Sequence, residues 1–187
     1  IDYGVIEVKE TAGSSLAKVG ERLVIARARL AAFASDCQIT SFGEAATVKG
    51  AALAGTICSH PLRGQGFDFD VPALAAGFAT TEEGTGIVHI APGHGADDWE
   101  LGIANGLEVP QTVDKDGCFY DHVPLFSGKH VYKVNGEVAN TIESAGGLLA
   151  RGSLTHRYPH SWRSKKPPAA WLPVEEPRPR KSNSSTL

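Results

Sequence analysis

The sequence contains no methionine and only three cysteines among its 187 residues. An initiator methionine followed by isoleucine is normally retained, so the absence of one before Ile1 indicates a piece of a longer protein. Cys37, Cys58 and Cys118 are widely spaced and form no Cys-x-x-Cys pair. The sequence therefore predicts neither a disulfide framework nor a thiolate zinc site. Unpaired thiols are typical of a reducing compartment, and we expect a cytoplasmic protein.

Long apolar runs are also missing. No stretch approaches the roughly 18 uninterrupted apolar residues that would cross a bilayer. The N-terminus lacks the basic-then-apolar pattern of a signal peptide, so we expect no membrane partner. Hydrophobic residues make up 42% and charged residues 21% of the chain, which is ordinary for a globular domain that buries a core.

Charge is distributed unevenly along the chain. Residues 1–150 carry 10 basic and 19 acidic residues, whereas residues 151–187 carry 8 basic and 2 acidic ones. The second part also contains six of the eleven prolines. Residues 166–187 are therefore expected to form a basic, Pro- and Ser-rich, disordered tail. The negative charge of residues 1–150 argues against strong independent binding of nucleic acid, because phosphate contacts dominate such affinity.

Short strands outnumber helices in the secondary structure that the sequence predicts. The expected strands are residues 3–8, 22–26, 86–90 and 148–155, short strands between 40 and 59, and an alternating stretch that begins at 67. The expected helices are residues 27–34, 96–105 and 135–145, and residues 113–120 are expected to form a hairpin with Asp116-Gly117 at its turn. Without a βαβ rhythm, this order predicts a mainly β domain with helical additions, resembling a β-barrel.

The densest chemistry lies in residues 84–99, GTGIVHIAPGHGADDW. His89 is expected on a strand that ends in a Pro-Gly turn, and Asp97 and Asp98 in the first helical turn, where carboxylates complement the helix dipole. A packed histidine, a tight turn and two dipole-complementing aspartates would explain each residue structurally. The turn could also bring His89, His94 and Asp98 into one cavity, since helix N-termini beside strand ends often bind anionic or polar ligands. The residues alone leave both interpretations open.

A metal site is one alternative for this segment. His89 and His94, with Asp97 or Asp98, offer nitrogen and oxygen ligands of suitable type. The spacing matches no zinc motif, however, and the Pro-Gly turn prevents the two histidines from sharing a helix face. We therefore expect no metal. The sequence also lacks the G-x-x-x-x-G-K-[ST] phosphate loop and the G-x-S-x-G nucleophile motif.

The whole pattern G-T-G-x-V-H-x-A-P-G-H-G-x-D-D resembles the editing domain of isoleucyl-tRNA synthetases. His60-Pro61-Leu62 upstream and Asp116-Gly117 downstream belong to the same resemblance, which covers residues 1–165. Valyl- and leucyl-tRNA synthetases carry related domains. The resemblance implies a closed β-barrel-like editing domain, inserted in the catalytic fold of a larger synthetase.

The resemblance also implies a reaction, the hydrolysis of the ester that joins a wrong amino acid, chiefly valine, to isoleucine tRNA. Such editing is needed because a pocket that accepts isoleucine cannot strongly exclude a side chain that is one methylene smaller. The implied partners are the 3′ end of isoleucine tRNA carrying the non-cognate amino acid and the rest of the parent synthetase. No cofactor is implied.

By position, the resemblance assigns roles to five residues. Asp98 corresponds to the aspartate that holds the α-ammonium group of the substrate, a task suited to a charge-assisted hydrogen bond. His89 corresponds to a histidine that lines the side-chain pocket, helps to reject isoleucine and orders the attacking water. Gly93, His94 and Gly95 correspond to the loop that shapes the cavity. Asp98 and His89 are therefore the expected catalytic residues, and all five are expected to bind substrate, with no metal and no protein nucleophile.

The sequence departs from the family pattern at both ends. A threonine-rich Thr-Pro-Trp-Thr motif expected upstream of Ile1 is missing, so the editing domain is expected to be N-terminally incomplete. Ser161 and Ser164 stand where many relatives have cysteines able to hold zinc, and we expect no zinc there.

Two other functions stay open. One is a catalytically inactive module that keeps the fold and weakly binds the aminoacyl-adenosine end. The other is a metal-dependent hydrolase that uses His89, His94 and Asp98.

Overall fold

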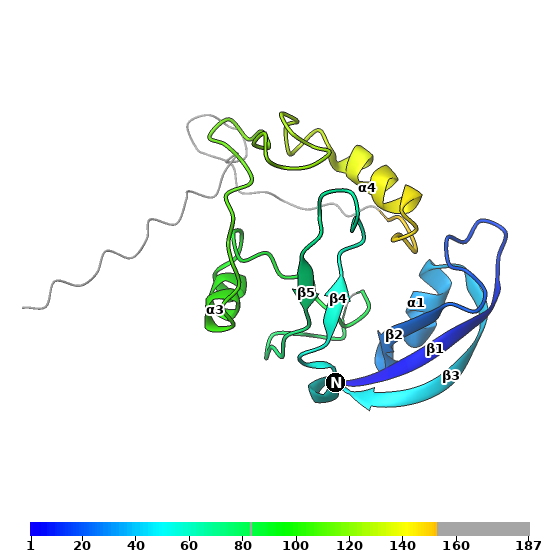
Figure 1. Ribbon diagram of the computed structural model, residues 1–187. Helices are drawn as coiled ribbons and strands as arrows, with labels where there is room; N and C mark the ends of the chain where they lie inside the picture. The colour runs from blue at the N-terminus through cyan, green and yellow to red at the C-terminus, as the bar shows by residue number, and fades with distance from the viewer. Residues whose placement is uncertain (83, 153–187) are drawn as a thin grey trace, which may run out of the picture.

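The structure is a computed structural model that describes residues 1–82 and 84–152 (Figure 1). The expected tail at 166–187 and the serines Ser161 and Ser164 lie outside the described residues, as do residues 153–165 of the expected editing domain.

The first part of the chain forms a three-stranded antiparallel sheet in the order β2–β1–β3. Strand β1 (Asp2–Thr11) lies in the centre, and it pairs with β2 (Arg22–Ala26) and β3 (Ile39–Lys49). Side chains alternate between the two faces of a strand, and Ile6 and Val8 of β1 are completely buried on the same face. The strands expected at residues 3–8 and 22–26 are confirmed.

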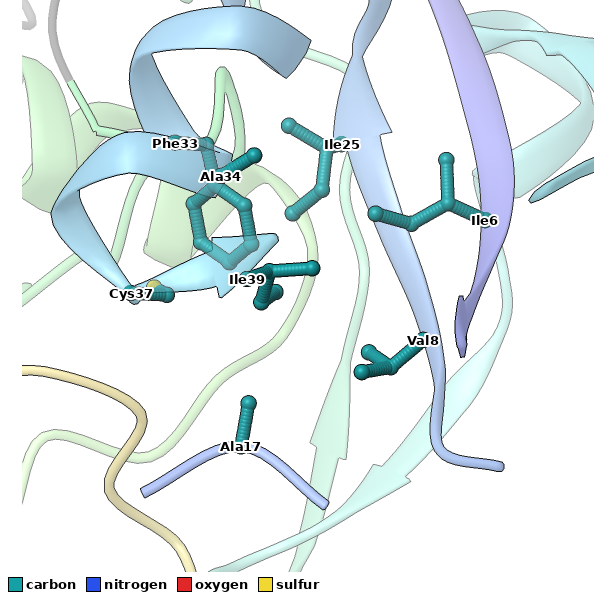
Figure 2. Close-up of a cluster of buried hydrophobic side chains, with 8 residues drawn as sticks. All are labelled: Ile6, Val8, Ala17, Ile25, Phe33, Ala34, Cys37 and Ile39. Carbon is teal, nitrogen blue, oxygen red and sulfur yellow. The ribbon is translucent and has the colours of Figure 1, made fainter. Parts of the chain in front are cut away.

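One hydrophobic core covers this face of the sheet. The 3₁₀ turn η1 (Arg27–Arg29) leads into α1 (Leu30–Asp36), which lies beside the sheet in Figure 1. Figure 2 shows side chains of β1, β2 and α1 pointing toward one another. The buried members of this first core are Ile6, Val8, Ala17, Ile25, Phe33, Ala34, Cys37 and Ile39. Burial raises the pKa of the Cys37 thiol, which therefore behaves as a small apolar side chain in this core.

The second part of the chain contains less regular structure. A short helix, α2 (Gly50–Leu53), leads to the two-stranded antiparallel pair of β4 (Ile57–Ser59) and β5 (Asp70–Pro72). Helices α3 (Ala96–Ala104) and α4 (Asn135–Ser144) follow. In Figure 1, α3 lies on the side of the β4–β5 pair away from the first sheet.

A second core lies beside α4. Its buried members are Leu62, Val123, Phe126 and Val134, and Val138 and Ile142 of α4 pack against them. Leu149 and Ala150, which follow α4, pack against the first core instead. The segment after α4 therefore connects the two cores.

Several local predictions are confirmed. The helices expected at 96–105 and 135–145 are α3 and α4, and each is followed by a glycine with positive φ, Gly106 and Gly146. The expected hairpin at 113–120 is a turn closed by a bridge between Val113 and Phe119, with Gly117 at a φ of 80°. The helix expected at 27–34 is shifted, because η1 occupies its first three residues and α1 continues to Asp36.

The expected closed barrel is not what the described residues show. Their two sheets are open, one with three strands and one with two, and residues 86–90 and 148–152 form no strand. A strand is stabilised by a neighbour that pairs with its N–H and C=O groups. Within residues 1–82 and 84–152 no strand pairs with 86–90, and the side chains of Ile87 and Val88 are 53% and 50% exposed. The fold is thus a mixed strand and helix domain, rich in β-structure at its N-terminal end. No helix within the described ranges has the length and apolarity needed to cross a bilayer.

Candidate functional site

The segment with the densest chemistry, residues 84–99, is attached to the first sheet at its beginning. The Tyr3 hydroxyl donates a buried hydrogen bond of 2.6 Å to the carbonyl oxygen of Gly86. Next to it, the backbone N–H of Ala26 donates to the carbonyl oxygen of Thr85 at 2.8 Å. These bonds connect positions more than fifty residues apart in sequence, so the segment lies against the end of β2 and the side of β1.

Two further features strengthen this attachment: the hydrogen bonds of Arg29 and the presence of glycine at position 86. The guanidinium group of Arg29 donates to the carbonyl oxygens of Gly84, at 3.2 Å, and Glu82, at 3.1 Å. Gly86 has a φ of +77°, and a Cβ atom there would lie only 2.5 Å from the Cβ of Ala26. Glycine is therefore required at position 86 for both the backbone conformation and the close approach.

A compact turn ends the segment at the start of α3. The N–H of His94 donates to the carbonyl oxygen of Ala91 at 2.8 Å, and the N–H of Ala91 donates to Oδ2 of Asp98, also at 2.8 Å. The Asp98 carboxylate also lies against Gly95, where a Cβ would be 3.5 Å from the Asp98 Cγ. The structure thus brings Ala91, Gly95 and Asp98 together, with the carboxylate in the first turn of the helix.

The five predicted site residues differ in exposure. Asp98 and Gly95 are half-buried, whereas His89, Gly93 and His94 are exposed. The expected shared cavity of His89, His94 and Asp98 is therefore an open surface at its two histidines. Within residues 1–82 and 84–152, no three His, Cys, Asp or Glu side chains form a group that could hold a metal ion.

His60 is a neighbour of this segment that the resemblance placed in a motif without a role of its own. Its ring stacks on Phe67, with centroids 4.9 Å apart and an interplanar angle of 13°, and is tilted against Phe69 at 5.1 Å. Its Nδ1 accepts a hydrogen bond from the N–H of Leu62 at 3.1 Å. Burial lowers the pKa of the His60 imidazole, and the nearby His89 lowers it further. His60 and His89 therefore lie close enough for their charges to interact, and the only sequence signal was the His60-Pro61-Leu62 motif.

Two cavities of about 400 Å³ each lie elsewhere, next to the end of α4. They share Leu16 and Glu143 in their walls, and neither is lined by a predicted site residue. The candidate segment is thus separate from both.

Comparison with known proteins gives a consistent set of relatives. No protein-family model matches the chain. The chain is 43% identical over 167 residues to an isoleucine–tRNA ligase of Pelagibacter ubique, and 42% identical over 178 residues to one of Gluconobacter oxydans. Each match covers 89% of this chain but only 18% of the ligase. An isoleucine–tRNA ligase of Caulobacter vibrioides is 41% identical over 165 residues, which are 81% of this chain and 17% of that ligase.

Proposed function

This chain is homologous to one region of the isoleucine–tRNA ligases, which are class I aminoacyl-tRNA synthetases, and we propose that it edits aminoacyl-tRNA. The substrate is valine esterified to isoleucine tRNA, and the reaction is hydrolysis of that ester in the cytoplasm. Hydrolysis joins the oxygen of a water molecule to the ester carbonyl carbon and breaks the bond to the ribose oxygen, which leaves with a proton. The partners are the charged 3′ end of the tRNA and the rest of a ligase.

The position of Asp98 is the observation that carries this proposal. Its Oδ2 accepts the Ala91 N–H at 2.8 Å, so the carboxylate is held in one orientation against Gly95. An ionised carboxylate has about four lone-pair sites, so one hydrogen bond leaves capacity for a substrate α-ammonium group. A charge-assisted bond to that group would fix the amino acid end of the ester next to the 91–98 turn.

His89 is the second functional residue of the proposal. It is exposed within residues 87–90, between the Gly86 and Ala91 anchors, and it lies near the His60 ring. A side chain in this place can contact the valine side chain of a bound ester and orient the attacking water. Gly93, His94 and Gly95 complete the loop on the other side. The protein then contributes orientation and electrostatics, and the water molecule is the nucleophile.

Deacylation of Val-tRNA(Ile) by the chain tests this function. Asp98→Asn keeps an oxygen that can accept the Ala91 N–H and removes the charge, so we expect hydrolysis to fall about 10- to 100-fold with the fold intact. Asp97→Asn is the matched control, because Asp97 is an exposed carboxylate in the same helical turn. His89→Ala should reduce the preference for Val-tRNA over Ile-tRNA. Equal activity of the Asp98 and Asp97 variants would contradict the proposal.

A second candidate is binding without hydrolysis. The exposure of His89 and His94 favours it, because electrostatic stabilisation of a transition state is weaker at an open, solvated surface than in a closed site. A non-hydrolysable valyl-adenosine analogue distinguishes the two functions. If the analogue binds to the chain, loses affinity in Asp98→Asn, and Val-tRNA is not cleaved, the chain is a binding module. The geometry gives no support to a metal-dependent hydrolase, since His89, His94 and Asp98 do not form a group that could hold a metal ion.

A further inference from the structure

The residues around His89 are held at two points. At one end the Gly86 carbonyl oxygen accepts the Tyr3 hydroxyl, and at the other the Ala91 N–H donates to Asp98. Residues 87–90 form no regular structure between these points. The position of His89 therefore depends on both anchors, and the Tyr3 anchor is the one that connects the segment to the first sheet.

Tyr3 is well suited to act as a fixed anchor. It lies in the central strand β1, opposite Ala26 of β2 and Val48 of β3, and it is only 6% exposed. Its ring is enclosed by glycines, because a Cβ at Gly50 would lie 3.1 Å from Tyr3 Cε2 and one at Gly86 would lie 3.7 Å from Cε1. The buried ring thus packs against the backbone at both glycines, which favours one position of its hydroxyl.

The face of the sheet on which Tyr3 lies has no part in the first core. Side chains alternate along β1, so Tyr3 lies on the face opposite Ile6 and Val8. The buried hydroxyl of Tyr3 thus serves the segment that crosses this opposite face. Its hydrogen bond is also enclosed, and a Gly86 carbonyl deprived of its donor would stay without an equivalent partner.

We infer that Tyr3 is a positioning residue for the editing site: through its buried hydroxyl it fixes Gly86, and through Gly86 it sets where His89 stands. The functional consequence rests on the proposed function: Tyr3 controls how well the site distinguishes valine esters from isoleucine esters. Tyr3 does not touch the substrate. Its effect is transmitted through Ile87 and Val88, the two residues between Gly86 and His89.

The variant Tyr3→Phe removes the hydroxyl and keeps the ring. Amide hydrogen exchange on the full chain should show faster exchange of the Ala26 N–H, which is bonded to Thr85, and of the Ala91 N–H. Loss of one buried hydrogen bond should raise these rates about fivefold. The Val131 N–H, bonded to Gly117 in another part of the chain, should keep its rate.

Deacylation measures the functional consequence. For Val-tRNA(Ile), kcat should fall more than KM changes, because a displaced His89 affects the reacting water, and the preference for Val-tRNA over Ile-tRNA should decrease. Tyr120→Phe is the matched control, since it removes a tyrosine hydroxyl next to His122 and leaves the Tyr3–Gly86 hydrogen bond in place. It should leave both exchange and discrimination unchanged.

Each outcome decides the inference. Unchanged exchange at Ala26 and Ala91 in Tyr3→Phe would overturn the anchor, and faster exchange with unchanged discrimination would overturn its role in specificity. If the unaltered chain does not cleave Val-tRNA, the proposed function fails. The role of Tyr3 is then tested by affinity: Tyr3→Phe should reduce the preference for a valyl-adenosine analogue over an isoleucyl-adenosine analogue. If Tyr3→Phe does not fold, Arg29→Gln releases the same segment at Gly84, and it should raise exchange at Ala26 in the same way.

Discussion

The pKa of the His60 imidazole is a measure of whether the candidate segment, residues 84–99, places His89 near His60 in solution. Burial against Phe67 and Phe69 lowers its pKa, and the nearby charge of His89 lowers it further. In His89→Gln the second cation is removed, so the pKa of His60 should rise part of the way toward its ordinary value of 6.5. A pH titration followed by NMR of the His60 ring protons measures this. His94→Gln is the control, and an equal rise in both variants would mean that His89 is not the neighbour.

Asp98 has a structural role that can be separated from its proposed function. Its carboxylate accepts the Ala91 N–H and also complements the start of α3. Asp98→Ala removes both interactions, and we expect it to lower the free energy of unfolding by about 1–2 kcal/mol. Asp97→Ala should lower the free energy of unfolding by only about 0.3–1 kcal/mol, because among the described residues the Asp97 carboxylate accepts no hydrogen bond from the turn and only complements the helix dipole. Urea unfolding of both variants measures the difference, and equal losses would mean that the Ala91 bond contributes little.

At the scale of secondary structure elements, the glycines of α3 and α4 differ in the space around them, so replacing them with alanine should have opposite effects on stability. A Cβ at Gly102 of α3 would lie 2.8 Å from Pro92 Cγ, so this glycine lets the Ala91–Pro92 turn pack on the helix. A Cβ at Gly136 of α4 would meet nothing within 4 Å. Gly136→Ala should therefore stabilise the protein by about 0.5–1 kcal/mol, the usual gain in a helix. Gly102→Ala should destabilise it by about 1–3 kcal/mol, because the methyl group forces the turn away.

Thermal unfolding of the two variants tests this contrast. The double variant Gly102→Ala with Pro92→Ala should recover part of the lost stability, because it removes the Pro92 Cγ at 2.8 Å and leaves the Cβ at 3.0 Å. If Gly102→Ala is as stabilising as Gly136→Ala, the Ala91–Pro92 turn does not pack on α3 in solution. The Ala91 N–H would then not be held in place to orient the Asp98 carboxylate.

The elements that the sequence predicted are those with local signals. Strand 22–26 and helix 135–145 follow from alternation, helical spacing and the glycine after the helix. Residues 86–90 have the composition of a strand, yet composition cannot reveal whether a partner strand is present, and in the described part of the chain none pairs with them. Contacts between distant parts of the chain were equally hidden from the sequence at the candidate site. His89 and Asp98 could be singled out by type and spacing, whereas the Tyr3–Gly86 bond spans 83 residues and leaves no local pattern.

At the scale of the whole molecule, the acidic charge of residues 1–150 limits how strongly this part of the chain can bind tRNA by itself. Residues 1–150 carry 19 acidic and 10 basic residues, and tRNA affinity depends mainly on phosphate contacts. The chain spans only 17–18% of the length of the ligases compared above. In the proposed function, the rest of a ligase therefore holds the tRNA body and this region receives its charged end.

The segment that follows α4 contacts both hydrophobic cores, so it can couple their unfolding. Leu149 and Ala150 pack on the first core, while a Cβ at Gly147 would lie 2.8 Å from Pro61, beside the second. Leu149→Ala removes a partly buried side chain from the first core only, and we expect a loss of about 1–2 kcal/mol there. Such a loss corresponds to roughly 5- to 30-fold more frequent opening of the first core.

Amide exchange can show whether the cores open together. The Val8 N–H, bonded to Glu21, reports on the first core, and the Val131 N–H, bonded to Gly117, on the second. Leu149→Ala should accelerate exchange at Val8 by the expected factor and at Val131 by much less, because the connecting segment contacts each core with different residues. Ile103→Ala, at a half-exposed site on α3, should change neither. Equal acceleration at Val8 and Val131 would instead mean that the cores form one cooperative unit, so that any change near Tyr3 also reaches α4.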